Sequence, residues 1–383
     1  MESADLSHAA YWQNQKVDLR FNPVDSPIRQ GLIDFIRREP ALAGQVLVAT
    51  SGSTGAPKFV ALSRRALLAS AAMVNRHLGA SAADRWLCAL PTFHVGGIGV
   101  HARAHLTGSP VLSFSGSGWK GRAREFAGRC REEAITLTSL TPTQVFDLVA
   151  EEIPAPDSLR AVIVGGGRLD PDLRTRARNL GWPVLASYGM TEAASQIATE
   201  GIGDEGDGEW LPVLYGWEAS VSEDDGRLRI RGEALFSGTV EKTEGKGWEF
   251  REAPRDERGW FETRDRATLS ADGRKLKFEG RCDDFIKRLG ELISMEAVRR
   301  RFNEVAASFG LCGTVAAVPD ERAGYRLVAY FERVAEGEGR IPPCLDAFHA
   351  GVAPFSRIDE IRVVDALPRT ALGKVAWARL AEL

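Results

Sequence analysis

The strongest constraint on the fold is a regular alternation of apolar, strand-length runs with amphipathic stretches, which continues to about residue 200. The strand-like runs are Trp86–Leu90, Val111–Phe114, Ile135–Leu140, Ala161–Val164 and Val184–Ser187. Between several of them apolar residues recur at helical spacing, as in Leu67, Leu68, Ala71, Val74 and Leu78, or from Leu169 to Leu180 behind Asp170-Pro171. This alternation predicts βαβ units, and therefore an α/β fold with a mostly parallel sheet.

Two different patterns follow this alternation. At 226–232 and 273–278, apolar and charged residues alternate with period two beside glycines, which predicts hairpin strands in a β-rich subdomain. Further on we expect a small α+β domain, with a helix over Met295–Ala307 and strands at Thr314–Val318 and Leu327–Phe331. The predicted domains are therefore residues 1–281 and 282–383.

Composition excludes several classes of protein. The 383 residues include 49 Lys and Arg against 52 Asp and Glu, so no strong basic field favours nucleic acid. The sequence holds no apolar run near the roughly 20 residues that span a bilayer, and its first residues lack the pattern of a signal peptide. Its five scattered cysteines are typical of reduced thiols. We expect a cytoplasmic monomer or homodimer without a membrane span.

A stretch of small residues and hydroxyls follows the apolar run 45–49 and precedes a helical pattern that begins near Ser63, so we expect a strand, a loop and then a helix. It consists of Thr50, Ser51, Gly52, Ser53, Thr54, Gly55, Ala56, Pro57 and Lys58. Glycines let backbone N–H groups close on a polyanion, while the hydroxyls and Lys58 add donors and charge suited to phosphate oxygens. The Gly-Lys-Ser/Thr ending of a Walker loop is missing. Taken alone, the stretch fits a phosphate loop and an ordinary surface loop equally well.

Two predicted strands end in residues that suit a nucleotide. The run Ala161–Val164 leads into Gly165, Gly166 and Gly167, where a flat ring can lie against bare backbone. The run ending at Ser187 leads into an aromatic ring, a hydroxyl and a carboxylate, within Tyr188, Gly189, Met190, Thr191 and Glu192. Ligands of α/β sheets bind beyond the carboxyl ends of strands, so these loops and the phosphate loop together indicate a nucleotide site.

Five segments resemble, in order, the signatures of the adenylate-forming superfamily, which includes acyl- and aryl-CoA ligases, luciferase and peptide-synthetase adenylation domains. They are Ser51–Lys58, Tyr188–Glu192, Gly259–Asp265, Gly280–Lys287 and Pro368–Lys374, and they span nearly the whole chain. The resemblance implies a two-step enzyme that joins a carboxylate to AMP and then passes the acyl group to a thiol, with ATP, Mg²⁺ and coenzyme A.

The resemblance also implies roles for individual residues. Residues 50–58 would cover the β- and γ-phosphates of ATP, and Gly166 and Gly167 would lie against the base or ribose. Tyr188, followed by Gly189 and Met190, would stack on adenine.

Around the reacting atoms, Thr191 would touch the α-phosphate and Glu192 would hold Mg²⁺. Asp265 and Arg281 would bind the ribose. Lys374 would reach the carboxylate and the α-phosphate during adenylation. Cationic groups suit this step because two anions must approach each other.

For the second step, the resemblance implies that the C-terminal domain swings about a hinge at Asp283. The rotation would withdraw Lys374 and bring the segment containing Lys287, Gly290 and Glu291 to the site. The coenzyme A thiol would then attack the acyl-adenylate, so no nucleophilic residue of the protein is required.

Within the family, the likeness is greatest to the o-succinylbenzoate–CoA ligases of menaquinone biosynthesis. Three segments support it: Ser187–Thr199 with its Ser195-Gln196 pair, Thr263-Arg264-Asp265, and Thr141–Val145. This likeness implies a pocket for an aromatic ring that bears a second carboxylate. The pocket would be lined by His94, which would also act at the reacting acyl group, and by Thr143, Gln144, Gly165, Ser195 and Gln196.

Other functions stay open at this stage. They are another aryl- or acyl-CoA ligase, a standalone adenylation domain that loads a carrier protein, and a non-catalytic nucleotide-binding relative. The presence of Lys58, Glu192, Asp265 and Lys374 disfavours the last of these. Relatives usually have on the order of a hundred more residues before the phosphate loop, so we expect an abbreviated N-terminal subdomain.

Overall fold

The computed structural model describes residues 5–21, 29–50, 58–114, 118–243, 247–289, 291–320, 322–333, 338–369, 375–376 and 380. The chain divides into two compact units. The first comprises residues up to Thr263 together with Ala267–Phe278, and the second comprises Arg264–Arg266 and the residues from Glu279 onward. The domain boundary that we predicted at residues 281 and 282 stays a prediction.

The centre of the first unit is a six-stranded sheet with the order β5-β4-β6-β7-β8-β9. Its strands are β4 (Trp86–Cys88), β5 (Val111–Ser113), β6 (Leu137–Leu140), β7 (Ala161–Val164), β8 (Val184–Met190) and β9 (Ser195–Thr199). All neighbouring pairs are parallel except β8 and β9, which are antiparallel. The predicted α/β fold with a mostly parallel sheet is therefore confirmed.

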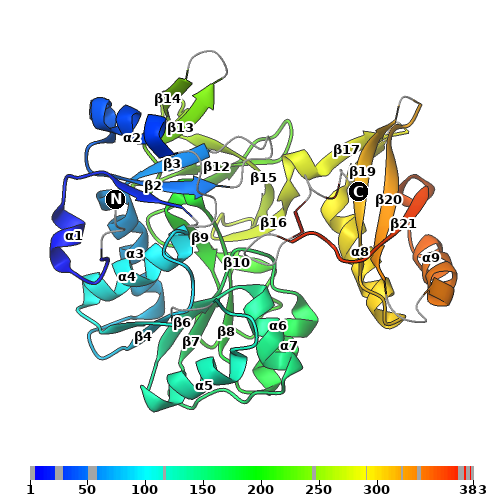
Figure 1. Ribbon diagram of the computed structural model, residues 1–383, viewed down its shortest axis with the longest axis horizontal. Helices are drawn as coiled ribbons and strands as arrows, with labels where there is room; N and C mark the ends of the chain where they lie inside the picture. The colour runs from blue at the N-terminus through cyan, green and yellow to red at the C-terminus, as the bar shows by residue number, and fades with distance from the viewer. Residues whose placement is uncertain are drawn as a thin grey trace. The chain divides into compact units, whose positions relative to one another are not determined.

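Helices cover both faces of this sheet (Figure 1). They are α3 (Arg64–Leu78), α4 (Val95–Thr107), α5 (Ala123–Glu132), α6 (Pro142–Ala150) and α7 (Pro171–Asn179). As Asp170-Pro171 predicted, α7 begins with a capped first turn, in which the Asp170 carboxylate accepts hydrogen bonds from two backbone N–H groups. Strands β4, β6 and β7 are fully buried; β4 and β7 are apolar, as is usual for parallel sheets, and β6 also contains Thr138 and Ser139.

A second sheet contains the flanks of the predicted phosphate loop. Its order is β1-β2-β3-β13-β14, with β1 (Asp18–Arg20), β2 (Gln45–Thr50), β3 (Lys58–Ser63), β13 (Gly238–Thr243) and β14 (Gly247–Glu252). We expected the loop to lead from a strand toward a helix, but a second strand, β3, intervenes and pairs antiparallel with β2. The reason is the run Phe59–Leu62, whose four side chains are all buried.

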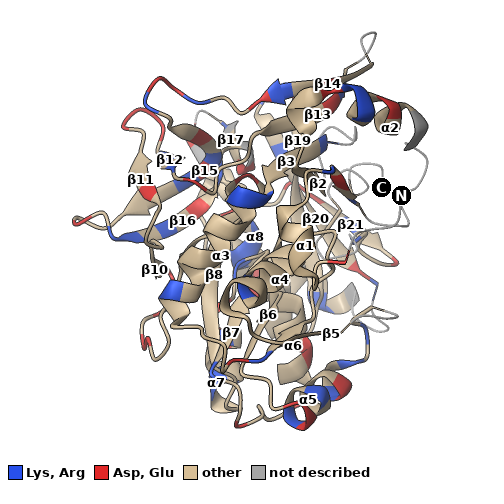
Figure 2. Cartoon of the chain, turned by 90° about the vertical axis from the view of Figure 1, so that its left-hand side faces the viewer, with Lys and Arg blue, Asp and Glu red and all other residues tan. Residues whose placement is uncertain are grey.

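A third sheet forms the β-rich subdomain and has the order β10-β16-β15-β12-β11. Its strands are β10 (Trp210–Pro212), β11 (Glu218–Val221), β12 (Arg227–Arg231), β15 (Phe261–Leu269) and β16 (Lys275–Arg281). Leu228 and Ile230 of β12 are buried. The arginines that alternate with them, Arg227, Arg229 and Arg231, pair with acidic neighbours. Figure 2 shows these opposite charges close together. The strands predicted from period-two alternation are thus confirmed as β12 and β16.

The remaining short helices of the first unit, α1 (Ala9–Gln13) and α2 (Arg29–Arg38), lie in its N-terminal part. Within the described residues, no helix is both long and apolar enough to cross a membrane.

The second unit has its own core. A hairpin of β17 (Phe285–Arg288) and β18 (Glu291–Ser294) precedes α8 (Met295–Ser308), and the sheet β19-β20-β21 follows. The sheet consists of β19 (Gly313–Asp320), β20 (Gly324–Glu332) and β21 (Glu360–Val364), and α9 (Ile341–Ala350) packs beside α8. The predicted helix and both predicted strands of this region are confirmed.

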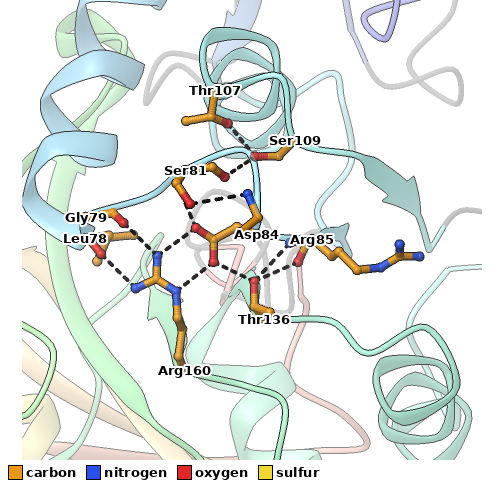
Figure 3. Close-up of polar contacts among 10 residues, drawn as sticks. Leu78, Gly79, Ser81, Asp84, Arg85, Thr107, Ser109, Thr136 and Arg160 are labelled. Carbon is orange, nitrogen blue, oxygen red and sulfur yellow. Dashed lines mark hydrogen bonds and ion pairs between the residues drawn. The ribbon is translucent and has the colours of Figure 1, made fainter.

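The amino ends of the central strands are joined by one polar cluster (Figure 3). Asp84, only 5% exposed, accepts hydrogen bonds from the Arg160 guanidinium at 2.7 and 2.9 Å, from the Thr136 hydroxyl at 2.8 Å and from the Ser81 N–H at 2.8 Å. Burial alone would raise the pKa of the Asp84 carboxyl, but Arg160 and the other donors lower it overall. The cluster therefore holds the starts of β4, β6 and β7 in one register.

We expect Asp84→Asn to lower the free energy of unfolding by roughly 2 kcal/mol, because it leaves the half-buried Arg160 without its countercharge. The difference from the wild type should shrink as the pH falls below about 4, where the unfolded carboxyl is protonated and the lowered folded pKa no longer stabilises the native state. Urea denaturation between pH 3 and 7 measures both effects. Glu125→Gln, which breaks a solvent-exposed pair with Arg122, is the control and should shift the midpoint little.

Candidate active site at the carboxyl edge of the parallel sheet

The loops that follow β4, β6, β7 and β8 all leave the central sheet at the same edge, because these strands are parallel. Gly165, the first residue after β7, donates its N–H to Leu140 at the end of β6. Gly166 has a φ of +78°, which favours glycine, and both Gly166 and Gly167 are exposed. The glycine turn thus presents bare backbone at this edge, as the sequence predicted.

Tyr188 lies beside this turn with only 9% of its surface exposed. Phe278 stacks on it, with ring centroids 5.2 Å apart and an interplanar angle of 27°. The next residue, Gly189, has to be glycine, because a Cβ there would lie 1.8 Å from the carbonyl oxygen of Ser195. The antiparallel pairing of β8 and β9 is also irregular at this point. Phe278 therefore holds one face of the Tyr188 ring, and the irregular pairing of β8 with β9 fixes the backbone directly after Tyr188.

The turn between β8 and β9 contains Thr191 and Glu192, both half-buried. Two non-glycine residues follow with positive φ, Ala194 at +51° and Ser195 at +132°. Strained backbone of this kind persists where the surroundings fix it, and it is common at functional sites. Here the carbonyl of Glu192 accepts the N–H of Phe236, which anchors the turn.

Glu192 could bind a metal ion together with a nucleotide. In the described part of the chain, no group of three or more His, Cys, Asp or Glu residues is arranged to hold a metal. A Mg²⁺ ion at Glu192 would therefore take its other ligands from phosphate oxygens and water, which is its usual way of binding to nucleotides. The donor set fits this ion.

His94 is the N-cap residue of α4, in the loop after β4. Its ring centroid lies 4.7 Å from that of Phe93. The helix start lies directly on the loop after β4. A Cβ on Gly97 would lie 2.4 Å from the carbonyl oxygen of Pro91 and 2.8 Å from that of Leu90. Glycine at this position thus fixes the position of His94 relative to the sheet.

Two predicted pocket residues have internal partners. Gln144, 6% exposed, forms a capping box with Thr141 and donates to the carbonyl of Ala89 at 3.3 Å. Gln196, 4% exposed, donates to the hydroxyls of Ser187 and Thr199. The Gln144 amide ties the start of α6 to the loop after β4, and the Gln196 amide ties β9 to β8. The exposed Thr143 lies in the first turn of α6. Contact of these residues with a substrate stays a prediction.

One residue that the sequence analysis missed is Arg103 in α4. It is 2% exposed, and within the described residues its guanidinium makes one hydrogen bond, to the Ser139 hydroxyl at 3.2 Å, and has no carboxylate partner. Its Cζ lies 5.4 Å from the centre of the Trp86 ring. Burial lowers the pKa of Arg103 to about 10, so the side chain stays charged at neutral pH.

Arg103 and Ser195 meet over the same glycine. A Cβ on Gly99, one helical turn before Arg103, would lie 3.0 Å from the Arg103 Nη2 and 3.6 Å from the Ser195 Oγ. Gly99 therefore leaves space between the guanidinium and a hydroxyl that the sequence placed in the acyl pocket. The signal in the sequence was a single arginine in a helix that otherwise consists of apolar residues, glycines, two histidines and a threonine.

The predicted ribose ligands belong to the second unit. Arg281 lies 3.7 Å from the Asp265 carboxylate, which is 14% exposed. The remaining predicted residues lie partly outside the described chain. Outside it are Ser51, Gly52, Ser53, Thr54, Gly55, Gly290 and Lys374, and the side chains of Asp283 and Lys287.

The described flanks show how two of these segments begin and end. Thr50 and Lys58 are register partners at the root of the phosphate loop. Arg369 and Val375 form an antiparallel bridge around the segment with Lys374, and Ala376 donates to Pro368 at 2.7 Å. Glu291 opens β18 opposite Arg288.

Comparison with known proteins identifies the family of this chain. The family model of AMP-binding enzymes matches residues 44–238. A probable 2-succinylbenzoate–CoA ligase of Mycobacterium tuberculosis (strain ATCC 25618 / H37Rv) is 31% identical over 348 residues, which cover 88% of this chain and 83% of that protein. The 2-succinylbenzoate–CoA ligase of Enterococcus faecalis is 28% identical and covers 86% of this chain and 67% of its own length.

Solved structures give the same result. The o-succinylbenzoate CoA synthetase of Bacillus subtilis, in complex with its acyl-adenylate intermediate, matches with a TM-score of 0.73 at 26% identity, covering 88% of this chain and 68% of that one. The same synthetase with ATP and magnesium ion matches with a TM-score of 0.71, over 88% of this chain and 69% of that one. The family match includes the described root of the phosphate loop, the glycine turn and Glu192, so this chain belongs to the AMP-binding enzyme family.

Proposed function

We propose that this chain is an AMP-forming acid–thiol ligase. It adenylates o-succinylbenzoate with ATP and then transfers the acyl group to coenzyme A, a step of menaquinone biosynthesis. The names of its relatives support the substrate, and the carboxyl-edge site supports the chemistry. We further propose that the enzyme works in the cytoplasm, as a monomer or homodimer.

The observation that carries the substrate assignment is the uncompensated charge of Arg103. An isolated cation in a dry interior is strongly unfavourable, so buried charges are normally paired. The described part of the chain provides an arginine pair elsewhere, in which Glu200 accepts from Arg174, but it provides no anion for Arg103. A bound ligand with a carboxylate would complete the site.

A dicarboxylate satisfies both ends of such a pocket. One carboxylate would pair with Arg103 and the Ser195 hydroxyl across Gly99, and the other would lie at the nucleotide. Trp86 under the guanidinium and the Phe93 ring next to His94 provide apolar surface for an aromatic ring. A fatty acid would leave Arg103 unpaired, and an amino acid would bring an ammonium group toward it.

In the first step, an oxygen of the substrate carboxylate attacks the α-phosphorus of ATP, and pyrophosphate leaves. Tyr188 and the glycine turn orient the base, while Thr191 and Lys374 donate to the oxygens on which charge develops. Mg²⁺ held by Glu192 and the phosphates supplies further positive charge for this step.

In the second step, the thiol of coenzyme A attacks the acyl carbonyl and AMP leaves. We propose that the second unit turns about Asp283 between the steps, so that Lys374 withdraws and the segment of Lys287, Gly290 and Glu291 takes its place.

A pyrophosphate-release assay with ATP, Mg²⁺ and a panel of carboxylates, with and without coenzyme A, tests the proposal. We expect coenzyme-A-dependent turnover on o-succinylbenzoate and little on benzoate or fatty acids. Turnover on those acids instead would refute the substrate assignment. Adenylation that proceeds only with a phosphopantetheinyl carrier protein as acceptor would identify a loading domain. ATP binding without turnover on any acid would indicate a non-catalytic relative.

Arg103→Gln should lower kcat/KM for o-succinylbenzoate by about 100- to 1000-fold, since it removes a desolvated charge pair worth several kcal/mol. The apparent melting temperature should not fall, because the substitution also removes an unpaired buried charge. Residual turnover on unsubstituted benzoate should change little. Arg103→Lys, which keeps the charge, should recover part of the lost activity. An equal loss on both acids would contradict a role in binding the second carboxylate.

Lys374→Ala should slow adenylation by about 100-fold or more, the usual effect of removing a group that neutralises charge in the transition state. Thioester formation from acyl-adenylate that is supplied to the enzyme should stay within a few-fold of wild type. Single-turnover measurements separate the two steps. Lys275→Ala, at an exposed position of β16, serves as the control for loss of a lysine. Equal decreases in both steps would show that Lys374 has a different role.

A further inference from the structure

Lys58, the last residue of the predicted phosphate loop, already has an anionic partner. It opens β3 and is the register partner of Glu241 on β13. Its ammonium lies 2.9 Å from the Glu241 carboxylate, and both side chains are partly buried, at 36% and 28% exposure. The same ammonium that would bind ATP phosphates is therefore engaged by a carboxylate of the neighbouring strand.

Glu241 is surrounded by further donors. The Thr239 hydroxyl donates to its Oε1 at 3.0 Å, and the Arg251 guanidinium of β14 lies 3.9 Å from its Oε2. Burial alone would raise the pKa of the Glu241 carboxyl, but Lys58, Thr239 and Arg251 lower it overall. Glu241 therefore stays ionised at neutral pH and retains Thr239 and Arg251 as partners when Lys58 moves away.

We propose that Glu241 is a positioning residue that holds Lys58 in a resting position, from which the phosphates of ATP must displace it. This inference rests on the proposed function, in which the loop before Lys58 binds those phosphates. A carboxylate and a polyphosphate compete for one ammonium, so the intrinsic affinity of the loop for ATP is reduced by the strength of the resting pair.

The pair is well suited to such a competition. Half-exposed ion pairs contribute little net free energy, so a triphosphate that offers several charges can replace the carboxylate. Arg251 also lies 3.2 Å from Glu249, the register partner of Glu241 on β14, and so links the two carboxylates. Release of Lys58 then leaves Glu241 with a cation nearby, which keeps the cost of release low.

Direct titration of the full chain with ATP and Mg²⁺, without a carboxylate substrate, tests the proposal. Glu241→Gln should tighten ATP binding by about two- to five-fold, the range expected for an exposed ion pair. The KM for ATP should fall by a similar factor. The kcat for adenylation should stay within about two-fold of the wild-type value, which is roughly the scatter between measurements on variants.

Two controls separate this competition from a general effect of charge. Glu249→Gln removes a carboxylate one strand further away, which accepts from Thr243 and Arg251, and should tighten ATP binding clearly less than Glu241→Gln does. In a Lys58→Gln background, Glu241→Gln should no longer tighten binding, because the pair is already broken.

The outcomes distinguish the two proposals. If the wild type binds no ATP, the proposed function itself fails. If the wild type binds ATP and Glu241→Gln binds it equally or more weakly, the resting-pair proposal is wrong. Equal tightening by Glu249→Gln, or tightening that persists without Lys58, would likewise overturn it.

Discussion

The parallel register of β4, β6, β7 and β8 is the constraint on which the site depends. Parallel strands end at one edge, so four loops that are far apart in the sequence come together there. The register itself is set at the opposite edge, where Arg160 joins Asp84 to the carbonyls of Leu78 and Gly79. A polar cluster at the amino ends therefore determines how accurately the residues at the carboxyl ends meet.

Two buried arginines differ in whether the described part of the fold provides a carboxylate partner for them. Arg174 forms a bidentate pair with Glu200, whose carboxylate also accepts the N–H of Ala186, so all three groups are satisfied within the fold. Arg103 is buried more deeply, and within the described residues its guanidinium has the Ser139 hydroxyl and the Trp86 ring as partners but no carboxylate. The first arrangement is complete without a ligand and fixes the start of α7 against β8. The second is incomplete, and such incompleteness is more informative about a ligand than any number of satisfied contacts.

Much of the fold could be predicted from the sequence, because the buried parallel strands are short and mostly apolar and alternate with amphipathic helices. The pairing of β3 with β2 was missed. The run Phe59–Leu62 contains only four apolar residues, and it lies between the predicted phosphate loop and the predicted helix. Gln144 carries the sequence signature of a capping box with Thr141, and the structure shows that bond. Arg103 could not be found from sequence, because a long cationic side chain in an apolar helix normally reaches solvent. The packing of α4 against α3 and against strands of the central sheet, including β4 and β6, buries it.

Gly99 has a consequence for how this protein diversifies. A Cβ at position 99 would lie 3.0 Å from the Nη2 of Arg103, the far end of a long side chain, and 3.6 Å from the Ser195 Oγ, so a small residue there would displace the guanidinium and leave the backbone of the sheet in place. Gly189 offers no such freedom, because any side chain there collides with the backbone of Ser195. If Arg103 binds a carboxylate of the substrate as proposed, a substitution at position 99 would change the accepted acid, whereas a substitution at position 189 would disrupt the pairing of β8 with β9.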